Sequence, residues 1–137
     1  MKFSTTHEKL FYAALEAAKN AYAPYSNFHV GAAVLTSDGS IVKGCNIENR
    51  SYGLTNCAER TALFKAISEK LRPVILALAT PDANYPVAPC GACRQVISEF
   101  MPEDAIIIFG STLENAVLTT VKELYPFDSL HELARDI

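Results

Sequence analysis

Val74-Ile75-Leu76-Ala77-Leu78-Ala79 is an unbroken apolar run that follows Pro73 and is itself followed by Thr80 and Pro81. A short apolar run bounded by prolines is typical of a buried β-strand. The flanking segments 57–70 and 90–100 favour helices, so the predicted strand lies between two helices in the sequence. Strands that alternate with helices indicate crossover connections and a sheet that helices cover on both faces.

The rest of the chain continues this alternation of strands and helices. Thr5 and Glu8 stand in capping-box spacing ahead of an alanine-rich segment, which predicts a helix that ends before Pro24. Asp38-Gly39 predicts a tight hairpin between two of the strands. Further strands are predicted at 28–35, 41–46, 105–109 and 116–120, and a short closing helix at 130–134. We therefore predict one domain over residues 1–137, built as a three-layer α/β/α sandwich.

Composition and charge limit the classes of partner. The chain has 137 residues, of which 50% are hydrophobic, and a net charge of -3. A chain of this size buries roughly two thirds of its unfolded surface and needs no disulfide to hold a core. Polynucleotide binding relies on clustered Lys and Arg, and the sequence shows no such cluster, so we expect no nucleic-acid polymer as a partner. A single nucleotide in a pocket is compatible with this charge.

Neither a membrane span nor an export signal is expected. The apolar run at 74–79 is far too short to cross a bilayer, and residues 1–8 contain no apolar core of a signal peptide. We therefore expect the protein in the cytoplasm, where its four cysteines stay reduced. Cysteines at ligand spacing in that compartment indicate metal or catalytic groups before disulfides.

Three of these cysteines lie in two motifs, Asn56-Cys57-Ala58-Glu59-Arg60 and Pro89-Cys90-Gly91-Ala92-Cys93-Arg94. Both motifs fall at predicted helix starts, with Asn56 as the expected N-cap of the first helix. Unpaired N–H groups at a helix start favour thiolate over thiol. Cys90 and Cys93 share a helix face because they are three residues apart, and Cys57 adds a third sulfur. Three such ligands predict one Zn²⁺ with an open fourth position, which is typical of a catalytic site.

Glu59 follows the first ligand by two residues, and we predict that it moves protons without binding the metal. This spacing matches the signature of zinc-dependent deaminases, with Cys in the first ligand position. Two alternatives stay open: the cysteines are ordinary buried side chains, or Cys90 and Cys93 form a redox pair. Both alternatives leave the spacing of Cys57 and Glu59 unexplained.

Three thiolates on Zn²⁺ carry a net charge of about -1, which calls for a nearby cation. Arg60 and Arg94 lie one turn beyond Cys57 and Cys90, so either could donate to sulfur, with Arg94 the better candidate for a plain surface arginine. Cys45 has no partner at ligand spacing and is interpreted as a small buried strand residue. The three histidines are at no ligand spacing either.

With these motifs in view, the sequence resembles the small, three-cysteine branch of the cytidine deaminase family. The resemblance covers nearly the whole chain, from Tyr25-Ser26-Asn27-Phe28 to the segment after Pro102, and its strongest stretches are 44–49, 57–62 and 89–95. It implies a mixed β-sheet, one Zn²⁺ per subunit, a nucleoside substrate, and a homotetramer whose sites are completed by neighbouring subunits.

The resemblance also implies roles for single residues. In this family pattern Asn46 and Glu48 would bond the ribose hydroxyls, Phe28 would pack on the pyrimidine, the Ala58 backbone would meet the base carbonyl, Tyr52 would reach into a neighbouring site, and Arg60 would bond to the zinc thiolates. Taken without the resemblance, Phe28 is better interpreted as core, Asn46 as the residue that ends a strand, and Glu48 as a solvated charge on a loop.

Two positions depart from the family pattern. Ser129 stands where the family tail carries an aromatic residue that enters a neighbour's site, and Phe127 is the candidate to replace it. Arg50 stands where small residues are common, near the expected 5′ end of the nucleoside. It is either a contact to a 5′-phosphate or a solvated or interface arginine.

The predicted reaction is hydrolytic removal of the 4-amino group of cytidine and 2′-deoxycytidine, which gives uridine or 2′-deoxyuridine and ammonia in pyrimidine salvage. Glu59 would take a proton from water and deliver protons to N3 and to the departing ammonia. Three rivals stay open: a deaminase of a related small molecule, a polynucleotide-editing deaminase, and a zinc-stabilised structural domain without activity.

Overall fold

A five-stranded sheet forms the centre of the structure, a computed structural model that describes residues 3–135. Residues 1, 2, 136 and 137 lie outside the described part of the chain. The strands are β1 (Gly31–Thr36), β2 (Ile41–Cys45), β3 (Pro73–Ala79), β4 (Ile106–Gly110) and β5 (Val117–Thr120). Their order is β2-β1-β3-β4-β5; β3 and β4 run parallel, and the other neighbours are antiparallel. The mixed sheet that the resemblance implied is confirmed.

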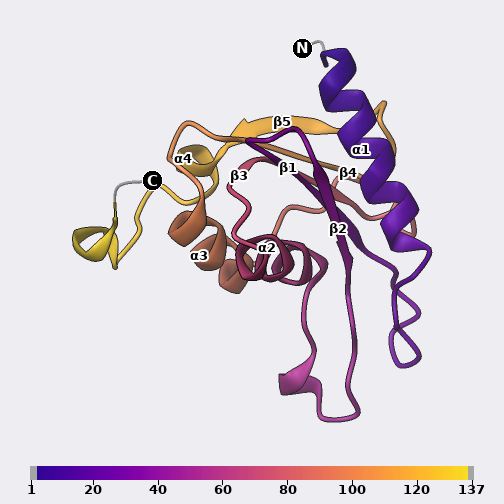
Figure 1. The fold of residues 1–137 in the computed structure, drawn as a ribbon. Helices are drawn as coiled ribbons and strands as arrows, with labels where there is room; N and C mark the ends of the chain where they lie inside the picture. Colours follow the sequence, from indigo (N-terminus) through magenta and orange to yellow (C-terminus); the bar gives the residue numbers. More distant parts are fainter. Residues whose placement is uncertain (1–2, 136–137) are drawn as a thin grey trace.

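Helices cover both faces of this sheet, as Figure 1 shows. They are α1 (Thr5–Ala18), α2 (Ala58–Ser68), α3 (Gly91–Phe100) and α4 (Val121–Leu124), with the 3₁₀ turns η1 (Tyr52–Leu54) and η2 (His131–Leu133). α1 packs on one face, and α2 and α3 lie on the other. The predicted α/β/α sandwich is therefore confirmed. None of the helices within residues 3–135 has the length and apolar character needed to cross a bilayer.

Alternation along the central strands supplies a hydrophobic core on each face. Ala33 and Ala77 lie in the core beneath α1, whereas Val34 and Leu76 lie in the core beneath α2 and α3. Successive side chains of a strand point to opposite faces, so a strand that helices cover on both sides is apolar at every position. This explains why β3 is an unbroken apolar run.

The start of α1 differs from the prediction by one residue. Ser4, not Thr5, is the N-cap: its side chain accepts from the His7 N–H at 3.1 Å, and the Ser4 N–H donates to His7 Nδ1 at 3.3 Å. The imidazole thus takes the place that the prediction gave to Glu8. A capping box needs a side-chain acceptor three residues after the cap, and His supplies one as well as Glu does.

β1 begins at Gly31, three residues later than predicted. The Asn46 side chain accepts from the Val30 N–H at 2.9 Å and donates to the Phe28 carbonyl at 2.8 Å. These bonds take up backbone groups that a longer strand would have used in its ladder. Residues 28–30 are therefore an ordered loop at the end of the sheet. At the C-terminus, the predicted helix at 130–134 is the single turn η2.

Gly31→Ala should destabilise the fold strongly, because a Cβ at this position would lie 1.9 Å from the Ala14 carbonyl oxygen and 2.4 Å from the Ala18 nitrogen. Both atoms belong to the backbone of α1, which would have to move away from the sheet. We expect a loss of about 3 kcal/mol in the free energy of unfolding, measured by urea denaturation. Gly53→Ala, whose Cβ meets nothing within 4 Å, is the matched control. Equal unfolding midpoints for the two variants would contradict the proposed close approach.

Candidate active site

The starts of α2 and α3 meet and carry the predicted metal ligands. Cys57 is the N-cap of α2 and Cys90 the N-cap of α3, and neither side chain caps its own helix. Cys93 is buried in the first turn of α3. Asn56, predicted as the N-cap of α2, instead pairs with Ile47 in an antiparallel bridge, so the helix begins one residue later. The cap position therefore aims a cysteine, not an asparagine, at the site.

The three sulfur atoms form one cluster. The Sγ atoms of Cys57, Cys90 and Cys93 all lie within 4.8 Å of one another, and those of Cys57 and Cys90 are 3.9 Å apart. A tetrahedral zinc with Zn–S bonds of about 2.3 Å places its sulfurs roughly 3.8 Å apart, so this spacing fits one zinc ion. Within residues 3–135, the cluster includes no histidine or carboxylate. Soft sulfur donors of this kind suit zinc and leave one coordination position for another ligand.

Hydrogen bonds within the cluster favour a thiolate at one of the cysteines. Donation from Cys93 and from Arg60 lowers the pKa of the Cys57 thiol to about 5, although its partial burial acts in the opposite direction. The bond to Cys57 and burial together raise the pKa of Cys93. A metal ion that binds these cysteines as thiolates must displace the protons that they carry.

Arg60 supplies the cation that the charge of the thiolates requires. Its Nη2 atom donates to Cys57 Sγ at 3.2 Å. Its Nε atom is buried and has no hydrogen-bond partner in the part of the chain that the structure describes. A guanidinium placed against the sulfurs offsets their negative charge and orients the ligand.

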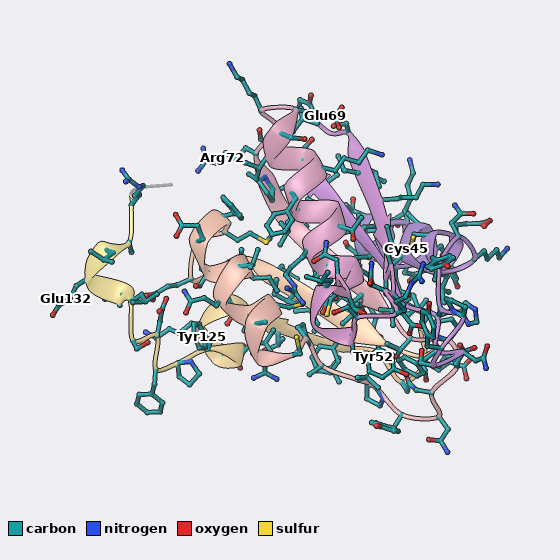
Figure 2. The ribbon with its side chains drawn as sticks, turned by 90° about the horizontal axis from the view of Figure 1, so that it is seen from below. Cys45, Tyr52, Glu69, Arg72, Tyr125 and Glu132 are labelled. Carbon is teal, nitrogen blue, oxygen red and sulfur yellow. The ribbon has the colours of Figure 1, made fainter. Side chains whose placement is uncertain are left out.

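Arg94 bonds to two backbone carbonyls, a role that the sequence did not predict. Its Nε donates to the Pro89 carbonyl at 2.8 Å, and its Nη1 donates to the Leu124 carbonyl at 2.6 Å. Arg94 is therefore neither a donor to sulfur nor a solvated surface residue. It ties the segment before α3 to the end of α4. Tyr125, labelled beside α3 in Figure 2, adds a bond from its hydroxyl to Gln95 at 2.6 Å.

Glu59 lies in the first turn of α2 and is 4% exposed. Burial is the main effect that raises the pKa of its carboxyl to about 7, and the thiolate charge of Cys57 acts in the same direction. A carboxyl with a pKa near neutrality can both accept and release a proton under ordinary conditions. Glu59 is thus a buried carboxyl close in sequence to the three-cysteine cluster, and it is not itself a member of that cluster.

A sequence model of the cytidine and deoxycytidylate deaminase zinc-binding region matches residues 4–109, a span that contains the three cysteines, Glu59 and Arg60. The chain belongs to the cytidine and deoxycytidylate deaminase family. It is therefore an enzyme, and the cluster at the starts of α2 and α3 lies within the region that defines the family.

Individual members of the deaminase family resemble the chain over most of its length. A cytidine deaminase from Halalkalibacterium halodurans is 54% identical over 82% of this chain and 86% of its own. The crystal structure of a cytidine deaminase from Burkholderia pseudomallei is 46% identical, with a TM-score of 0.84 over 89% of this chain and 98% of that one. A blasticidin-S deaminase from Bacillus cereus is 35% identical over 72% of this chain and 74% of its own.

The residues that the deaminase resemblance assigned to the nucleoside lie on two loops, one before β1 and one after β2, and at the start of α2, where Ala58 is the first helical residue. Asn46 is 8% exposed, and both ends of its amide already bond to residues 28–30. The Glu48 carboxylate accepts from the N–H groups of Tyr25 and Ser26 at 3.0 and 3.2 Å and from the Ser26 hydroxyl. These contacts to the preceding loop were not predicted, and the sequence offers no local signal for them because they join residues more than twenty positions apart.

Tyr52, labelled in Figure 2, lies on the long loop between β2 and α2, which projects from the rest of the fold in Figure 1. Its side chain is 73% exposed, and its ring centroid is 6.0 Å from that of Tyr25. Arg50 is exposed on the same loop. In the tail, Phe127 is 91% exposed, and Ser129 is exposed as well. The roles predicted for Tyr52, Arg50 and Phe127 stay predictions.

Proposed function

We propose that the protein is a zinc-dependent cytidine deaminase, which converts cytidine or 2′-deoxycytidine and water into uridine or 2′-deoxyuridine and ammonia. The observation that carries this proposal is the buried Glu59 beside a three-sulfur cluster whose donor set leaves one metal position open. The identity to cytidine deaminases supports cytosine nucleosides as the substrate class. We assign the reaction to pyrimidine salvage, because both its substrate and its product would be free pyrimidine nucleosides.

Cys57, Cys90 and Cys93 would hold one zinc ion per subunit. Zinc in such a site supplies Lewis acidity, which lowers the pKa of a coordinated water molecule to about 7. Arg60 keeps the cluster oriented through its bond to Cys57 and offsets part of the thiolate charge. The helix starts at Cys57 and Cys90 add the positive ends of two helix dipoles.

Glu59 is the proton carrier of the proposed reaction. Its carboxylate accepts a proton from the attacking water, and the oxygen adds to C4 of the cytosine ring. Glu59 then gives that proton to N3 and moves a second proton from the new C4 hydroxyl to the 4-amino group, so that the C4–N bond breaks, ammonia leaves and the C4 carbonyl forms. Burial keeps bulk water away from this carboxyl and holds its pKa in the range where both directions of transfer are accessible.

The substrate contacts of this proposal come from both loops and from the start of α2. The backbone N–H of Ala58 would donate to the base carbonyl, and Phe28 would pack against the pyrimidine ring. Asn46 and Glu48 would bond the ribose hydroxyls with the capacity that their contacts to the loop leave free. Asn46 retains one amide hydrogen for this purpose, and Glu48 retains acceptor capacity on Oε2.

We further propose a homotetramer of single-domain subunits, each spanning residues 1–137, in the cytoplasm. The exposed Tyr52 on a projecting loop supports a contribution to a neighbouring site. All four cysteines are free thiols, and the three in the cluster must stay reduced to bind metal.

Blasticidin S is the alternative small-molecule substrate that the comparisons raise. The higher identity to cytidine deaminases favours cytidine, 54% against 35%. Turnover of both compounds, compared as kcat/KM, ranks the two substrates directly.

The test is ultraviolet absorbance of cytidine with purified protein, repeated after zinc is removed with a chelator and then restored. We expect the cytidine spectrum to change into that of uridine, to stay unchanged after chelation, and to change again when zinc is added back. Protein that holds zinc at one ion per chain but leaves cytidine intact would contradict the proposed substrate. Turnover that survives complete removal of zinc would contradict the proposed metal.

A further inference from the structure

One side chain, Ser26, joins the loop before β1 to the loop after β2. Its hydroxyl donates to Glu48 Oε2, and the same oxygen accepts from the Phe28 N–H at 3.0 Å. Glu48 Oε1 accepts from the N–H groups of Tyr25 and Ser26. The carboxylate thus receives three hydrogen bonds from two consecutive residues.

The backbone around Ser26 is set in one conformation. Asn27 has a φ of 58°, in the left-handed region that Asn tolerates better than most residues. On the far side of this turn, Asn46 holds the Phe28 carbonyl and the Val30 N–H. The loop therefore presents the Ser26 hydroxyl to Glu48 from a frame that is fixed at both ends.

The hydrogen bonds to Glu48 show which acceptor position of its carboxylate stays free for a ligand. A carboxylate offers about four acceptor positions, of which the loop occupies three on Glu48. Oε1 accepts twice, so the free position lies on Oε2, beside the Ser26 hydroxyl. The hydroxyl bond is also the first cause of the lowered pKa of Glu48, which keeps the carboxylate ionised and able only to accept.

We propose that Ser26 is a positioning residue for sugar recognition: its hydroxyl fixes the Glu48 carboxylate so that one Oε2 position faces a ribose hydroxyl. This proposal rests on the proposed function, in which Glu48 binds the sugar. Without the hydroxyl, Oε2 can rotate away and accept from water. The sugar then binds more weakly, because its binding must also order a carboxylate that the loop no longer holds in place.

The test compares kcat/KM for cytidine with kcat/KM for 2′,3′-dideoxycytidine, which has no ring hydroxyl for Glu48. Ser26→Ala should lower the ratio of the two values by about tenfold, mainly through a higher KM for cytidine, since hydrogen bonds to a charged group are the stronger class. The ratio does not depend on the fraction of folded protein. Ser26→Thr, which keeps the hydroxyl, should retain the wild-type ratio.

Ser40→Ala is the matched control, because the Ser40 hydroxyl donates to the Asp38 carboxylate at 2.7 Å in the β1–β2 turn. It removes the same kind of bond at the other end of the hairpin and should leave the ratio unchanged. An unchanged ratio in Ser26→Ala, or an equal fall in Ser26→Thr, would overturn the positioning role while the proposed function stands. If the wild-type enzyme does not deaminate cytidine, the proposed function is wrong, and this proposal falls with it.

Discussion

Glu59→Gln is expected to lower kcat for cytidine by about a thousandfold or more, while the protein keeps its zinc. Gln has nearly the shape of Glu and can occupy the buried first turn of α2, but it cannot carry a proton between water, N3 and the leaving amine. The cysteine cluster stays intact because Glu59 is not one of its members. The loss should therefore appear in turnover and not in metal content.

The measurement is steady-state turnover of cytidine, with zinc content determined on the same samples. Glu69→Gln is the matched control: Glu69 is exposed at the opposite end of α2 and is labelled there in Figure 2. It should have wild-type kinetics. Turnover within about tenfold of wild type in Glu59→Gln would contradict the role of proton carrier, since a general acid or base contributes at least about a hundredfold.

Cys90→Ser should weaken zinc binding by at least about a hundredfold and abolish turnover at ordinary zinc concentrations. A serine hydroxyl is a poor ligand for zinc, because it does not ionise near neutral pH and zinc in such sites is held by thiolate sulfur. Cys90 is exposed, so the smaller oxygen disturbs no core packing. The expected readouts are loss of bound zinc after dialysis and loss of the rise in melting temperature that added zinc gives the wild-type protein.

Cys45→Ser is the control for this second prediction. Cys45 is half-buried at the end of β2, outside the cluster, and burial raises the pKa of its thiol. Its replacement should leave zinc content at one ion per chain. Retention of zinc at wild-type affinity in Cys90→Ser would show that the metal is held elsewhere.

The helices and strands could be predicted where a local sequence pattern specifies them. The apolar run of β3 and the Asp38-Gly39 turn gave the correct strands, since burial on both faces and a turn glycine with positive φ leave clear sequence patterns. The errors fall at element ends. Asn56 was a good N-cap by composition, but its backbone pairs with Ile47, and a tertiary bridge outweighs a capping preference of about 1 kcal/mol. β1 likewise begins later than predicted, because the Asn46 side chain bonds to the backbone of the residues before it.

In the candidate site, too, local features could be predicted from the sequence and long-range contacts could not. The ligand types and the place of Glu59 two residues after Cys57 are local facts, fixed by chain spacing and by the helical repeat. The bonds of Arg94 to Leu124 and of Glu48 to Ser26 join segments 30 and 22 residues apart, so no local pattern reveals them.

The sequence by itself determined which atoms are the candidates for the proposed chemistry: three sulfurs, one carboxyl and one guanidinium, placed at two helix starts. Only the tertiary structure decided that Cys57 lies 3.9 Å from Cys90, which is 33 residues further along the chain. It also decided that Glu59 is buried and that Glu48 is held by Ser26. The physical reason is that spacing along a helix follows from covalent geometry. Distances between helices, and the loss of water that raises the pKa of Glu59, arise when α2 and α3 pack on the same face of the sheet.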